Sequence, residues 1–260
     1  MEHDLLEYRG RVGPLHALDP RPKLLVTLAF VLLLLATPPT RWPAVGASVA
    51  FACLLLAASR LPLSFVLKRT LVILPFVLVV GLSLPFLRTG EGTHRLAEWQ
   101  LGPGSLVVTR EGLEVLWGVL LRAVLGMMAV VVLGATTPFP ALAGGLRRLG
   151  LPRTLTLILS FLYRYLFVLV DEVTRMNQAR ESRSYGGSRL WHLRTVGRMV
   201  GTLFVRSIER GERVYQAMLS RGFEGQMRTL VAMRLTRADS SLVLLAGAGL
   251  ASVLALRFVP

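Results

Sequence analysis

Residues 113–135, LEVLWGVLLRAVLGMMAVVVLGA, form an almost unbroken apolar run, and this run decides the fold class. A helix that crosses a bilayer needs about 20 apolar residues, so the run is long enough to span a membrane. Further apolar blocks cover residues 24–36, 66–87 and 242–256. Blocks of this length, without alternation of apolar and polar residues, are typical of membrane helices. The sequence therefore predicts an all-α, polytopic membrane helix bundle.

The composition agrees with a membrane protein and limits the partners. The 260 residues are 53% hydrophobic and only 17% charged, whereas soluble domains carry about 25% charged residues. The net charge is +15. Because hydrophobic spans separate the basic residues, cytoplasmic loops that face an acidic partner or a lipid surface are a better interpretation than nucleic-acid binding. The acidic residues before the first apolar block argue against a cleavable signal peptide, so we expect a retained N-terminus.

Several enzyme and metal-site signatures are missing from the sequence. Neither lysine, Lys23 or Lys68, closes the glycine-rich loop that binds ATP phosphates in a Walker A motif. The four histidines lie far apart, and Cys53 is the single cysteine, so no pattern of metal ligands is formed. A Gly-x-Ser-x-Gly nucleophile elbow is also missing. We therefore expect a chain that is not an enzyme and that holds neither a cofactor nor a metal.

The distribution of basic residues predicts the membrane topology. Lys and Arg mark the cytoplasmic side of a membrane protein, which places the basic N-terminal leader inside. Five spans are then expected, at about residues 24–38, 42–59, 71–87, 113–135 and 240–256. The polar stretch 88–111, in which three arginines balance three glutamates, is expected on the outer face.

A sixth apolar run, residues 155–170, is expected not to cross the membrane. It carries Arg164 near its middle, which is costly in lipid. The segment 172–239 that follows has 13 arginines against six acidic residues, and a crossing would place this segment outside. The predicted domains are therefore residues 1–135, with the leader and four spans, residues 136–238, a cytoplasmic helical coupling insertion, and residues 239–260, the last span.

Proline and glycine residues divide this insertion into three predicted helices. The first begins at Pro138 and ends at Gly150, and the second covers residues 152–185. The third covers residues 190–221, is amphipathic, and has Gly222 as its C-terminal cap. Asp171 and Arg175 are in i,i+4 register on the second helix. The small-residue pairs Gly197/Gly201 and Gly247/Ala251 permit close contact between helices.

Both long helices of the insertion carry an arginine near the C-terminal end, Arg180 on one and Arg221 on the other. An arginine in this position offers a planar fork of donors to a carboxylate or to exposed carbonyl groups of another protein. It also interacts favourably with the dipole of its own helix. A third interpretation is a basic patch that binds anionic lipids of the inner leaflet. The residues alone leave these three interpretations open.

Longer motifs give the sequence a resemblance to a known family. The leader LDPRPKLL (residues 18–25), ATTPF (135–139), LGLP (149–152) and FLYRYLF (161–167) are similar to the transmembrane T component of energy-coupling factor (ECF) transporters, in its cobalt-type CbiQ branch. The resemblance covers essentially the whole chain. It implies that two short signatures, Ala179-Arg180-Glu181 and Ser220-Arg221-Gly222, dock to the ATPases. Glu181 stands where the family has glycine.

The resemblance also implies the function and the partners. The chain would be the coupling subunit of an ATP-driven importer, for cobalt(II) uptake that serves cobalamin biosynthesis, in a prokaryotic inner membrane. Its partners would be two ABC-type ATPase subunits, which bind the ATP, a substrate-binding membrane S component and the lipid bilayer, but not nucleic acid.

Several alternatives stay open from the sequence. The chain could be a T component for nickel or a vitamin. A stand-alone permease would need paired ionisable groups within its spans, and Arg122 is an intramembrane charge without an obvious acidic partner. A membrane enzyme could use only Asp171 and Glu172, which point about 100° apart on one helix and do not converge.

Overall fold

The polypeptide divides into two compact units of unequal size. The computed structural model describes residues 15–16, 18–38, 41–81, 95–101, 104–183, 188–225 and 237–258. Unit 1 consists of Met1–Gly145 and Met233–Pro260, and unit 2 consists of Leu146–Ala232. The division into residues 1–135, 136–238 and 239–260 stays a sequence-based prediction beside these units.

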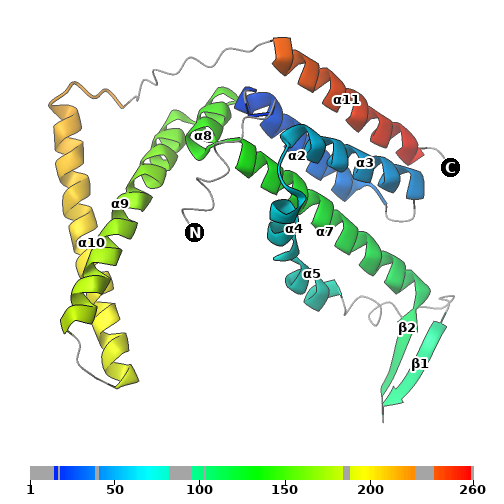
Figure 1. Cartoon of the computed structure of the whole chain (residues 1–260), viewed down its shortest axis with the longest axis horizontal. Helices are drawn as coiled ribbons and strands as arrows, with labels where there is room; N and C mark the ends of the chain where they lie inside the picture. The colour runs from blue at the N-terminus through cyan, green and yellow to red at the C-terminus, as the bar shows by residue number, and fades with distance from the viewer. Residues whose placement is uncertain are drawn as a thin grey trace. The chain divides into compact units, whose positions relative to one another are not determined.

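Unit 1 is built mainly from helices (Figure 1). Its elements, in chain order, are α2 (Pro20–Ala36), α3 (Trp42–Ser59), α4 (Leu63–Leu71), α5 (Leu74–Gly81), β1 (Arg95–Leu101), β2 (Gly104–Thr109), α7 (Arg110–Thr136) and α11 (Arg237–Phe258). Helix α8 (Phe139–Arg148) begins in unit 1 and ends in unit 2.

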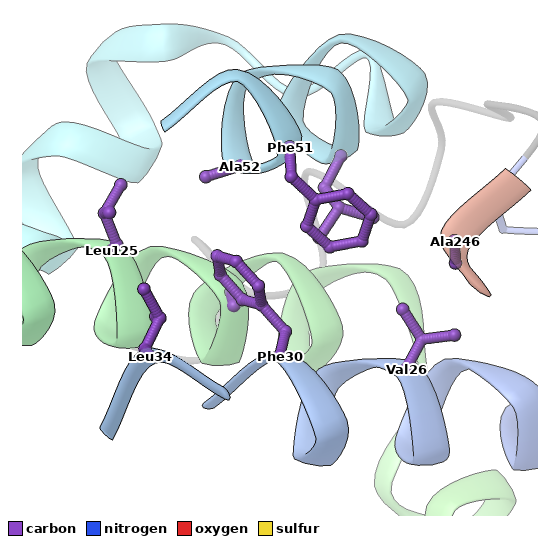
Figure 2. Close-up of a cluster of buried hydrophobic side chains, with 9 residues drawn as sticks. Val26, Phe30, Leu34, Phe51, Ala52, Leu125 and Ala246 are labelled. Carbon is purple, nitrogen blue, oxygen red and sulfur yellow. The ribbon is translucent and has the colours of Figure 1, made fainter. Parts of the chain in front are cut away.

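The core of unit 1 lies where α2, α3, α7 and α11 pack together. Val26, Phe30 and Leu34 recur at four-residue steps, which places them on one face of α2. Phe30 is fully buried, and its ring lies 5.0 Å from the ring of Phe51 of α3, centroid to centroid. Figure 2 shows both rings between Leu125 of α7 and Ala246 of α11. The largest side chains of these helices therefore form a contiguous packed core.

Glycine allows α11 to approach this core closely. A Cβ atom at Gly249 would lie 2.6 Å from Cδ2 of Phe51, which is shorter than any ordinary contact. At Gly247, a Cβ atom would meet nothing within 4 Å. Of the pair Gly247/Ala251, which was expected to permit close helix contact, Gly247 has open space around it, and α11 makes its close approach at Gly249 instead.

Four helices of the described residues are long and apolar enough to cross a membrane. Three of these candidate spans, Trp42–Ser59, Gly112–Thr136 and Asp239–Leu256, coincide with predicted spans. The fourth, Arg153–Arg183, contains the apolar run that was expected to stay on one side of the membrane. Helix α2, which has 17 residues, matches the predicted span over residues 24–38.

The expected span over residues 71–87 does not begin as one continuous helix. Helix α4 ends at Leu71, and α5 begins at Leu74. Pro75 lacks a backbone N–H and its ring would clash with the carbonyl of residue 71, so a continuous helix is disfavoured here. The same ring is favourable in the first turn of a new helix. Residues 82–87 lie outside the described residues.

A β-hairpin lies within the polar stretch 88–111 that is expected on the outer face. Strands β1 and β2 are antiparallel, with Trp99 opposite Leu106 and Leu101 opposite Gly104. The prediction of a polytopic helical membrane protein is confirmed, and the hairpin is an addition to it.

Unit 2 consists of the end of α8 and a pair of long helices, α9 (Arg153–Arg183) and α10 (Arg189–Leu219). The two helices lie side by side and run in opposite directions (Figure 1). Gly150 has a φ of 110°, a value that suits glycine, and it separates α8 from α9. The three predicted helices of the insertion are confirmed, although the predicted stop at residues 185–187 lies outside the described residues.

Candidate functional site: two arginines on the helix pair

Arg221 lies directly after the last turn of α10. Ser220 caps the helix, and Gly222 follows with a φ of 77°. The Gly222 N–H donates to the Leu219 carbonyl at 2.9 Å, and the Phe223 N–H donates to the Met218 carbonyl at 3.1 Å. These bonds satisfy carbonyl groups that a helix end leaves without partners, so the predicted glycine cap is confirmed. The cap holds the backbone of Arg221 in a defined position.

The Arg221 side chain is available to a partner molecule. Arg221 is exposed, as are Ser220 and Gly222 beside it. Among the residues that the structure describes, no acidic side chain forms an ion pair with the Arg221 guanidinium. A guanidinium presented in this way can bind a carboxylate in a two-pronged geometry or donate to several exposed carbonyl groups.

Arg180 has a different environment near the end of α9. Its side chain is only 22% exposed, and Nη2 lies 3.7 Å from Oε1 of the adjacent Glu181. The same Glu181 oxygen accepts a hydrogen bond of 2.8 Å from Nδ2 of Asn177. The Nε atom of Arg180 is buried without a hydrogen-bond partner. Ala179 is exposed. Arg180 is therefore partly occupied by Glu181, yet it keeps one unsatisfied donor, which is unfavourable until an acceptor reaches it.

A salt bridge joins α9 to α10 between these two arginines. Glu172 of α9 accepts hydrogen bonds from Arg206 of α10, at 2.6 Å, and from Arg175 of its own helix, at 3.0 Å. The expected neighbour of Arg175, Asp171, is thus replaced by Glu172, which lies three rather than four residues away.

The position of this bridge separates the two candidate arginines. Arg180 lies beyond Glu172 toward one end of the antiparallel pair, and Arg221 lies beyond Arg206 toward the other. At 1.5 Å per residue, about 35 Å of helix axis lies between them. One partner domain of ordinary size would not contact both arginines through a single short groove.

The helix pair buries very little of its own surface. No residue of α10 is buried, and Thr156 is the single buried residue of α9. Large apolar side chains are exposed on both helices, among them Leu162 and Leu166 of α9 and Leu190, Phe204 and Ile208 of α10. Contiguous apolar surface of this kind marks contact with lipid or with another protein.

A hollow of about 300 Å³ also lies between the two helices. Phe161, Tyr165 and Leu169 line it from α9, and Val214 and Met218 line it from α10. The two helices are therefore not tightly packed over this stretch. A Cβ atom at Gly197 or Gly201 would meet nothing within 4 Å, so this small-residue pair makes no close helix contact with the part of the chain that the structure describes.

Arg122, a charged residue within the α7 span, is hydrogen-bonded to the backbone of α2. Its Nη2 atom donates a hydrogen bond of 2.6 Å to the carbonyl oxygen of Thr37, at the C-terminal cap of α2. A helix end leaves its last carbonyl groups without partners, and in lipid such groups are costly. Arg122 therefore helps to cap the C-terminal end of α2.

The remaining chemical candidates are not brought together into a site. Of the two acidic residues proposed for the enzyme alternative, Glu172 is bound by two arginines and Asp171 is exposed. Over the described ranges, no group of three His, Cys, Asp or Glu side chains could hold a metal ion.

Comparison with known proteins points to one family. Residues 11–231 match the family model CbiQ, described as cobalt transport protein. A cobalt transport protein CbiQ of Rhodobacter capsulatus is 29% identical over 209 residues, which cover 80% of each chain. The energy-coupling factor transporter transmembrane protein EcfT of Thermosediminibacter oceani is 28% identical over 238 residues, 86% of each chain. A putative fused cobalt transport protein CbiMQ of Methanocorpusculum labreanum is 28% identical over 229 residues, 87% of this chain and 37% of that protein.

Proposed function

Since the chain belongs to the CbiQ family of cobalt transport proteins, we propose that it is the coupling subunit of an ATP-driven importer. Family membership and the apolar helices make it a multi-pass membrane component of an ECF-type transporter. In the proposed mechanism, two ABC-type ATPases close on ATP and displace the two arginine-bearing helices. The helices pass this motion to a substrate-binding membrane subunit.

The exposed Arg221 at a rigid, glycine-capped helix end is the observation that carries this proposal. Arg180, about 35 Å away along the helix pair, supplies a second contact, which suits two separate ATPase subunits. The exposed apolar side chains of α9 and α10 support a further partner surface for the substrate-binding subunit. The helix cap at Arg221 favours protein docking over a lipid patch, because a lipid patch does not require an arginine in a defined position.

Cobalt(II) is the proposed cargo, carried by the partner subunit rather than by this chain. Two observations support the choice: the matched family is described as cobalt transport protein, and two of the relatives reported above are named for cobalt transport. We further propose that ATP is bound only by the ATPase partners and that the complex lies in a prokaryotic inner membrane. Cobalt is favoured over nickel or a vitamin by these names.

Removal of the Arg221 guanidinium tests the docking proposal. A charge-assisted hydrogen bond contributes about 1.5–3 kcal/mol, so Arg221→Ala should reduce the ATPase that co-purifies with the complex at least tenfold. Arg180→Ala should reduce it about two- to threefold, because Glu181 already engages that guanidinium.

Arg213→Ala is the matched control, since Arg213 is 68% exposed on the same helix as Arg221 and makes only a long contact of 3.8 Å to Glu209. The control should retain the ATPases and the cobalt(II) uptake of the wild-type chain. Wild-type ATPase yield and uptake in the Arg180→Ala, Arg221→Ala double variant would contradict the docking proposal.

A further inference from the structure

Unit 1 contains a buried ionic cluster, formed by Asp19, Arg21, Lys23, Thr137 and Asp239. Asp19, Lys23 and Asp239 are exposed by only 7%, 5% and 2% of their surface. The backbone N–H of Asp19 donates a hydrogen bond of 2.7 Å to Oδ1 of Asp239, 220 residues away in sequence. Two carboxylates and two cations make the cluster neutral in formal charge.

Two further contacts complete this cluster. Lys23 Nζ donates to Oγ1 of Thr137 at 3.4 Å. The backbone N–H of Arg21 donates to Oδ1 of Asp19 at 3.0 Å, and Arg21 Nε lies 3.6 Å from the same oxygen. Burial of a charge is strongly unfavourable unless its partners stay in place, and loss of one partner leaves an uncompensated charge. The cluster therefore fixes its members in one arrangement.

The members of the cluster come from three separate helix ends. Asp19 caps α2, Thr137 lies between α7 and α8, and Asp239 lies in the first turn of α11. Carboxylates at helix N-termini also interact favourably with the helix dipole.

The sequence neighbours of the cluster are the two connections between the units. The chain leaves unit 1 through α8, shortly after Thr137, and returns after Ala232, shortly before Asp239. Helix α8 is also held against the start of α2. A Cβ atom at Gly145 would lie 3.2 Å from Cβ of Pro20 and 3.3 Å from Cδ1 of Leu24. Helix α8 and the first turn of α11 thus both contact the start of α2, whose next turns carry Val26 and Phe30 of the core.

We propose that the ionic cluster is the anchor that transfers movement of unit 2 to the helices of unit 1, with Lys23 and Asp239 as positioning residues for coupling. This inference rests on the proposed function, in which the chain transmits ATPase motion. The start of α2 contacts both α8 and the first turn of α11, so a displacement of either helix end acts on α2 as well. Without the cluster, the connections could move while the core of unit 1 stayed in place.

Lys23→Met tests this proposal in the complete transporter, purified with its ATPase and substrate-binding subunits and reconstituted in vesicles. We expect ATPase co-purification and ATP hydrolysis within twofold of wild type, and cobalt(II) uptake at least tenfold lower. Lys23→Arg keeps the charge and should restore at least half of the uptake. Lys68→Met, which removes the other lysine of the chain from an exposed position on α4, should behave as wild type.

A second variant covers the case in which Lys23→Met does not assemble. Asp239→Asn keeps an oxygen that can accept from the Asp19 N–H but removes the charge, and it should lower uptake about threefold at unchanged ATPase yield. Wild-type uptake in Lys23→Met would overturn the proposal. A parallel loss of yield, hydrolysis and uptake in Asp239→Asn would also overturn it, because the cluster would then be needed for folding alone. If the wild-type chain itself failed to recruit the ATPases, the proposed function would fall, and this outcome is separate from the others.

Discussion

The two units differ in how much of their side-chain surface is buried. Unit 1 buries Phe30 completely and also buries three charged residues, Asp19, Lys23 and Asp239. Unit 2 exposes large apolar side chains along α9 and α10 and holds its helices together by a salt bridge at the surface. Unit 1 also exposes large apolar side chains, Leu28 and Leu32 of α2 among them, so the described parts of the units differ in their buried core and not in their exposed apolar surface.

The largest expected difference between the units concerns a phenylalanine in each. Phe30→Ala should destabilise the chain by about 3–5 kcal/mol, because it leaves a cavity beside Phe51. Phe204→Ala should leave the stability of the isolated chain nearly unchanged, since Phe204 is 66% exposed. Thermal unfolding of both variants in detergent measures the comparison. Equal destabilisation by the two variants would show that α10 is packed as tightly as α2.

A pH-dependent difference is expected from Lys23. Burial lowers the pKa of Lys23 from 10.5 to about 8, although Asp239 and Asp19 oppose this shift. Between these two pKa values the unfolded chain binds more protons than the folded chain, so the Lys23 contribution to stability rises with pH across this window. The total rise is at most about 3 kcal/mol.

Unfolding at pH 7 and at pH 10 measures this effect, with Lys23→Met as the reference that lacks the titrating group. The increase of stability with pH should be smaller in Lys23→Met than in the wild-type chain. An identical pH dependence in the two chains would show that Lys23 is not desolvated.

A smaller effect is expected from two glycines of α11. Gly249→Ala should cost about 1–3 kcal/mol, because the new Cβ would overlap the Phe51 ring. Gly247→Ala meets open space and should be neutral or slightly stabilising, since alanine favours helices. Comparison of the unfolding temperatures of the two variants in detergent shows which face of α11 contacts α3. The reverse order would place Gly247 at the α3 contact instead.

The smallest effect is expected for the exposed salt bridge of unit 2. Glu172→Gln removes the charge that Arg175 and Arg206 share. Exposed ion pairs contribute little and are screened by salt. The variant should therefore unfold close to the wild-type temperature in 0.1 M salt and at the same temperature in 1 M salt. A large loss that persisted at high salt would mean that this bridge carries the stability of unit 2.

Local signals in the sequence predicted much of the helical fold. Gly150 and Gly222 end helices because they take up positive φ values, and both ends are found where the sequence indicates them. The β-hairpin also had a local signal in the sequence, Gly-Pro-Gly at residues 102–104 beside alternating apolar residues. This signal predicts a hairpin within the polar stretch 88–111.

Contacts between distant residues were beyond the reach of such signals. The partnership of Asp19 with Asp239 depends on how α2 and α11 pack, and no spacing in the sequence reports it. The choice between Gly247 and Gly249 depends on the rotation of α11, which is decided by the position of Phe51. The ion pair of Arg180 with Glu181, in contrast, involves adjacent residues, and Glu181 stands where the family has glycine.

Amide hydrogen exchange on the chain, alone and in complex with its ATPases, tests the central claim most directly. The docking proposal predicts new protection around residues 177–183 of α9 and 216–223 of α10, with the stronger protection beside Arg221. Unchanged exchange in both segments, in a complex that holds the ATPases, would contradict it.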